Sequence, residues 1–83
     1  MISGGASIKS KRFVEVLWLD AEGHAAWTTE KEADKLEAPL VTMRGYLVRR
    51  TKKVLVLAMG YHEDSWLNVF TIPSGMVQKV TTL

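Results

Sequence analysis

Short runs of β-branched and aromatic residues, separated by polar turns, constrain the fold of this chain more than any other feature. Such runs are typical of strands, because branched and aromatic side chains pack well on a pleated surface. The longest uninterrupted apolar run, residues 54–59, is far shorter than the ~20 residues that a membrane-spanning helix requires. The sequence therefore predicts a mainly β protein whose five strands cover residues 12–19, 40–50, 54–62, 66–72 and 76–83.

One short helix is predicted between the first and second strands, within residues 28–39. Thr29 followed by Glu32 matches a capping box, in which each side chain accepts a hydrogen bond from the backbone N–H of the other residue. Pro39 ends the helix, because proline disfavours helical geometry at the residue before it. A helix this short depends on packing rather than on intrinsic propensity.

The five strands predict a small closed barrel, because an open sheet would leave two apolar edges exposed. Gly45 indicates a bulge or a strong bend that helps the sheet to curl. Residues 71–83 contain a strand ending in Ile-Pro, one expected helical turn and a short final strand. This layout resembles the end of the small SH3-like and Sm-like barrels. We expect residues 12–83 to form this single domain and residues 1–11 to form a flexible N-terminal arm.

Composition excludes several classes of function. The chain has 83 residues and no cysteine, so it has no disulfides, thiolate zinc sites or thiol nucleophiles. The first residues lack the apolar segment of a signal peptide, and we expect a cytoplasmic protein. The sequence has no phosphate-binding glycine loop and no nucleophile elbow, and the adjacent residues His62, Glu63 and Asp64 are poorly placed to converge on one metal ion. We therefore expect no enzymatic activity, no cofactor and no metal site.

Charge is distributed unevenly along the chain, although the net charge is only +2. Residues 1–12 carry +3, residues 13–38 carry −5 and residues 39–83 carry +4. Separated charges of this size can attract an anionic partner, or a second copy of the chain. Since a small domain buries only roughly 60% of its unfolded surface, self-association is a natural way to bury more. A homo-oligomer is therefore expected.

The basic segment between the second and third strands is a candidate nucleic-acid site. Alternation along a strand places Arg44, Tyr46 and Arg50 on one side, where an arginine and an aromatic ring beside a lysine-rich loop can bind phosphate and stack on a base. The alternative is a solvated turn whose lysines discourage pairing with another sheet edge. The candidate residues are Arg44, Tyr46, Arg49, Arg50, Lys52 and Lys53.

The three tryptophans are assigned different roles. Trp18 lies within an apolar strand and is expected in the core. Trp27 and Trp66 lie at the edges of elements, where a half-exposed indole is typical of an interface anchor.

Most of residues 14–83 also resembles a group of small uncharacterised proteins encoded by tailed bacteriophages. The resemblance is carried by VEVLWLDA (14–21), Trp27, GYLVRRTKKVLVLA (45–58) and TIPSGMVQKVTTL (71–83). It implies an accessory phage protein with the barrel fold and no assigned chemistry. The leading hypothesis is therefore an oligomeric, non-enzymatic protein that binds a host protein in the host cytoplasm. The alternatives are nucleic-acid binding through residues 49–53 and sequestration of a nucleotide second messenger in a pocket between subunits.

Overall fold

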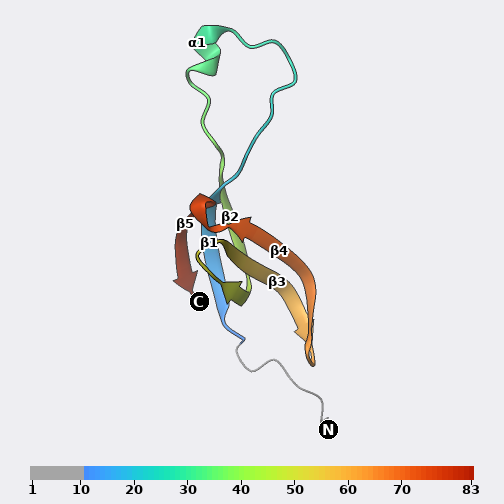
Figure 1. Ribbon diagram of the computed structural model, residues 1–83. Coiled ribbons are helices and arrows are strands. Elements are labelled where there is room, and N and C mark those ends of the chain that lie inside the picture. Colours follow the sequence, from blue (N-terminus) through green and yellow to red (C-terminus); the bar gives the residue numbers. More distant parts are fainter. Residues whose placement is uncertain (1–10) are drawn as a thin grey trace.

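The computed structural model describes residues 11–83, which form one curled antiparallel sheet and a long excursion away from it (Figure 1). The flexible N-terminal arm that the sequence predicts at residues 1–11 lies almost entirely outside the described residues. The strands are β1 (Phe13–Leu19), β2 (Leu40–Arg50), β3 (Val54–His62), β4 (Ser65–Pro73) and β5 (Val77–Thr82). Between them lie the helix α1 (Glu30–Ala33) and the 3₁₀ turn η1 (Ser74–Met76). Five strands and one short helix between the first two are thus confirmed.

The strands are arranged in the order β4-β3-β2-β1-β5. β2 is the longest strand, with 11 residues, and it pairs with β1 through its first half and with β3 through its second half. The pairing of β2 with β3 shifts register between Leu47 and Arg49. The irregularity predicted at Gly45 therefore lies a few residues further along β2.

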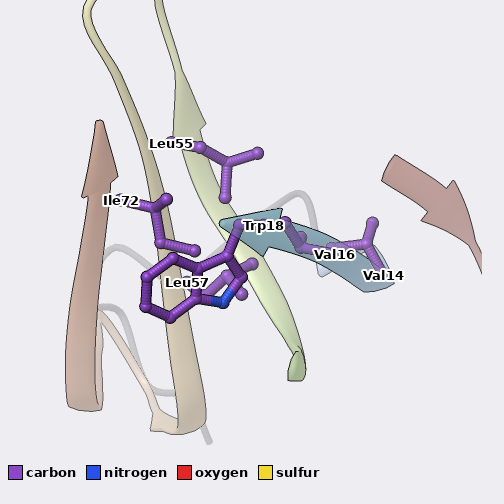
Figure 2. Packing of buried hydrophobic residues seen from close by; sticks show 6 residues of the cluster. All are labelled: Val14, Val16, Trp18, Leu55, Leu57 and Ile72. Atoms are coloured by element: carbon purple, nitrogen blue, oxygen red, sulfur yellow. The ribbon is translucent and has the colours of Figure 1, made fainter. Parts of the chain in front are cut away.

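The prediction of a closed barrel is wrong, because β4 and β5 are the two edges of an open sheet. η1 connects the end of β4 to β5, which lies beside β1. β5 therefore pairs with β1 and not with β4. The core is covered because the sheet folds over itself. Val14, Val16 and Trp18 of β1 pack in one cluster with Leu55, Leu57 and Ile72 of β3 and β4 (Figure 2). Within residues 11–83, curling without closure thus buries the core and leaves the outer edges of β4 and β5 unpaired.

Trp18 occupies the core as predicted. Its side chain is buried, and its ring lies 5.6 Å from that of Phe70 on β4. Its indole Nε1 is buried and has no hydrogen-bond partner among the described residues. β1 and β4, at distant positions in the sheet order, therefore face each other across the core.

Gly45 is required by the close approach of β2 to β3. A Cβ atom at this position would lie 2.8 Å from the carbonyl oxygen of Ala58 and 3.0 Å from Cε of Met59. Because the nearer atom belongs to the backbone, Gly45→Ala must separate the two strands. We expect a loss of about 1–3 kcal/mol in the free energy of unfolding, measured by urea denaturation.

Gly75→Ala is the matched control for this prediction, since a Cβ there meets nothing within 4 Å. It should change the free energy of unfolding by less than about 1 kcal/mol, with stabilisation as the expected sign. Equal effects of the two substitutions would contradict the role assigned to Gly45.

Candidate binding surfaces

Residues 49–53, here called the basic turn, form an exposed cationic tip whose backbone is held by hydrogen bonds. The Thr51 hydroxyl accepts hydrogen bonds from the backbone N–H groups of Lys53 and Val54, both at 3.1 Å. Ser74 of η1 braces the turn, since its hydroxyl donates to the Thr51 carbonyl at 2.9 Å and its N–H donates to the Lys53 carbonyl at 2.9 Å. The turn therefore presents four cations from a fixed backbone: Arg49, Arg50, Lys52 and Lys53.

None of these four cations lies within 4.0 Å of a carboxylate in residues 11–83. Arg44 differs from them, because its Nε donates to Oε2 of Glu15 on the neighbouring strand at 2.8 Å. Its charge is thus compensated by a partner whose side chain is only 24% exposed. Of the predicted nucleic-acid residues, the four in the basic turn remain available together, whereas Arg44 is already paired.

Four aromatic rings gather at the other end of β3, and we call them the aromatic cluster: Phe13, Tyr46, Tyr61 and Trp66. The ring of Tyr46 is central, with centroids 5.1 Å from Phe13, 5.2 Å from Tyr61 and 6.4 Å from Trp66. Tyr61 and Trp66 are cross-strand partners in β3 and β4, and their rings lie 6.3 Å apart. These edge-to-face and tilted arrangements are the preferred geometries of aromatic pairs.

The aromatic cluster is partly open to solvent. Tyr61 is 42% exposed, Phe13 is 39% exposed, and Tyr46 and Trp66 are half-buried. The Lys11 ammonium lies 4.7 Å from the centroid of the Tyr61 ring, at cation–π distance. Trp66 and Tyr46 were predicted as separate candidate binding residues on different strands. The structure brings them together in one cluster. It adds Phe13, whose only signal in the sequence is its position at the start of a strand.

Trp27 lies in a segment that extends far from the sheet, which we call the projecting arm and define as residues 20–39 (Figure 1). Every residue from 21 to 38 is exposed, and Trp27 is fully exposed. The neck of the arm is held by the Leu19–Leu40 pair and by a 3.0 Å hydrogen bond from the Asp20 N–H to the Pro39 carbonyl. Trp27 and Trp66 are therefore in different parts of the molecule and do not form one site within a chain.

α1, within the projecting arm, is only one turn long. The predicted capping box is present, with the Thr29 hydroxyl accepting from the Glu32 N–H at 3.2 Å and Glu32 Oε1 accepting from the Thr29 N–H at 3.3 Å. Glu32 accepts hydrogen bonds from the Thr29 hydroxyl and from the Thr29 backbone N–H. These two bonds, of which the first has the larger effect, hold the pKa of Glu32 below its usual value of 4.5. Glu32 is therefore charged at neutral pH.

A shallow apolar groove of about 270 Å³ lies between β2, β3 and β4. It is lined by Met43, Met59, Asn68, Val69 and Phe70, and we call these five residues the apolar groove. Asn68 has a left-handed backbone with a φ of 51° inside β4, a conformation that asparagine tolerates better than most residues. Sequence reasoning missed this groove, because its residues are far apart in the chain.

A second hollow, of about 350 Å³, lies at the base of the projecting arm between Asp20, Glu22, His24 and Glu37. His24 Nε2 lies 2.9 Å from a Glu22 carboxylate oxygen, and both side chains are about half exposed. In the described part of the chain, no three histidine, cysteine or acidic residues are grouped as metal ligands, and no helix is long and apolar enough to cross a membrane.

Comparison of the chain with protein-family models, curated proteins and solved structures finds no match.

Proposed function

We propose that this protein is a non-enzymatic binding protein of a tailed bacteriophage, which self-associates and engages a protein of its host in the host cytoplasm. The phage assignment rests on the sequence resemblance of residues 14–83. We further propose that the sheet is of the SH3-like or Sm-like type. The strand order β4-β3-β2-β1-β5 and the single 3₁₀ turn between β4 and β5 support this classification.

The observation that carries the binding function is the aromatic cluster. The four rings, which pack around Tyr46 and are partly exposed on strands, offer a large apolar area at little cost in side-chain entropy. Tyrosine and tryptophan are also the residues most enriched among interface positions that dominate binding energy. The Lys11 ammonium above Tyr61 and the polar tips of the two tyrosines suit a partner surface with both apolar and acidic groups.

The test is affinity capture of host proteins by the immobilised full chain, followed by measurement of Kd with the purified partner. Tyr61→Ala combined with Trp66→Ala should raise Kd by about 30-fold or more, since hot-spot truncations cost ≥ 2 kcal/mol. Leu67→Ala is the control, because Leu67 lies on β4 beside Trp66 and is exposed but outside the cluster. Capture that is equally strong with the double variant would refute the assignment of the cluster.

Nucleic-acid binding is the second candidate function, and the hydrogen-bonded basic turn favours it. Four uncompensated cations on a fixed backbone can contact several phosphates at once, so that affinity should fall steeply as salt is raised. Lys52→Glu combined with Lys53→Glu should abolish this binding and leave the melting temperature nearly unchanged, because both side chains are exposed. Fluorescence anisotropy with short DNA and RNA at two salt concentrations measures it. Binding that survives the charge reversal would exclude the basic turn as the site.

A further inference from the structure

We propose that the projecting arm of one chain docks on a second copy of the chain, with Trp27 seated in the apolar groove and α1 lying against the basic turn. The contact is reciprocal and produces a two-fold symmetric dimer. This inference specifies the self-association proposed above and is independent of the host partner and of the aromatic cluster.

Among residues 11–83, the projecting arm has no packing partner in its own chain. Its residues 21–38 are all exposed, including the apolar side chains of Trp27 (103%) and Leu36 (50%). A tryptophan held in water leaves about 150–250 Å² of mostly apolar surface uncovered. The hydrogen-bonded neck at Asp20 and Pro39 nevertheless directs the arm away from the sheet (Figure 1). The arm is thus shaped to meet another molecule.

The described part of the same chain also carries an open apolar groove that can receive such a side chain. The apolar groove is open, and Met59, Val69 and Phe70 in it are exposed by 46%, 53% and 39%. Its two methionines can adapt to an indole ring, because an unbranched thioether makes favourable sulfur–aromatic contacts. Asn68, which also lines the groove, supplies an amide oxygen that can accept a hydrogen bond from the indole N–H.

Charge complementarity identifies the partner as a second copy of the chain. The projecting arm contains six acidic and two basic residues, a net charge of −4, and the basic turn carries +4. The spacing also matches. α1 begins three residues after Trp27, and β4 runs three residues from Phe70 to Pro73, which pairs with Val54 beside the basic turn. Three residues of extended chain span roughly 10 Å, so an indole in the groove places the acidic α1 near the cations.

The size of the contact is adequate for a stable dimer. A standard interface uses about 20–30 residues from each partner, and residues 20–39 with the apolar groove and the basic turn fall within that range. Two reciprocal contacts share a single loss of translational and rotational freedom, so the second contact adds affinity at low entropic cost.

Sedimentation velocity of the full chain tests the proposal with one variant in each half of the contact. Wild type should be a dimer whose Kd rises with salt. Trp27→Ala removes the anchor, and Val69→Glu places a charge in the groove. Each variant alone should be monomeric, with Kd raised by about a hundredfold or more, because each loses the anchor contact at both sites. Trp66→Ala is the matched control and should remain dimeric.

Mixing the two monomeric variants provides the decisive measurement. The intact arm of the Val69→Glu chain can still dock on the intact groove of the Trp27→Ala chain, so an equimolar mixture should form heterodimers of intermediate affinity. A mixture that stays monomeric overturns the proposal, as does a Trp27→Ala chain that remains dimeric. If Trp27→Ala remains dimeric, the chain still self-associates, but not through this interface. If wild type is monomeric at high micromolar concentration, both the proposed self-association and the proposed interface are refuted.

Discussion

Leu57→Ala is expected to lower the free energy of unfolding by about 2–5 kcal/mol, the range observed when a buried leucine is truncated in a core. Leu57 is fully buried in the centre of β3, and it belongs to the cluster that joins β1 to β3 and β4 (Figure 2). The cavity would lie between two parts of the sheet whose contact replaces barrel closure. Since domains are stable by only about 5–15 kcal/mol, this single change removes a large share of the total.

Leu67→Ala is the matched control, because it makes the same chemical change on the neighbouring strand at a side chain that is 61% exposed. It should alter stability by no more than about 0.5 kcal/mol. Urea denaturation followed by tryptophan fluorescence measures both, and Trp18 reports directly on the core. If the two variants lose similar stability, the core is not organised around β3 as described.

The strands could be predicted from the sequence because their signals are local. β2 and β3 match the predicted ranges, and the other three strands differ by one residue or so at their ends. The predicted strands leave residues 63–65 as the connection between β3 and β4, and the structure shortens it to Glu63 and Asp64. Glu63 adopts the positive φ that such a tight turn needs, at 54°. Glutamate in this role gives little sequence signal, since asparagine or glycine is the usual choice.

The helix was predicted in the right place but too long. Its N-terminus carries a capping box, which is readable from Thr29 and Glu32. Its length depends on whether Leu36 finds a surface to pack on, and in this chain Leu36 is exposed. A helix without a buried face has only its propensity to sustain it, and α1 stops at Ala33.

Closure and the binding surfaces could not be predicted, because both depend on contacts between residues distant in sequence. We expected a barrel because closure covers the apolar edges of a sheet. In the structure, the sheet instead curls over its own apolar side chains and forms a core without closing. The aromatic cluster joins residues from four strands, and the apolar groove joins residues from three. Only the basic turn, which lies within five consecutive residues, was predicted as a unit.

The largest effect on assembly is expected from removing the projecting arm. Replacing residues 22–37 by a short Gly-Ser loop should leave the melting temperature unchanged or slightly raised, because none of these residues is buried. The β1–β2 ladder ends at the Leu19–Leu40 pair, so a short loop can connect the two strands. Loop-closure entropy falls with length, by about 0.6 kcal/mol for each halving. Circular dichroism with thermal melting tests this part of the prediction.

The same deletion should abolish the dimer, as measured by sedimentation velocity, and its effect should be at least as large as that of Trp27→Ala in the intact arm. The deletion removes the charges of α1 as well as the indole, whereas the point substitution removes only the indole. The difference between the two effects therefore measures what the rest of the arm, with its charged helix, adds to the anchor. A folded, arm-deleted chain that still dimerises would show that association uses the open edges of β4 and β5, and a chain that fails to fold would show that the arm stabilises the sheet.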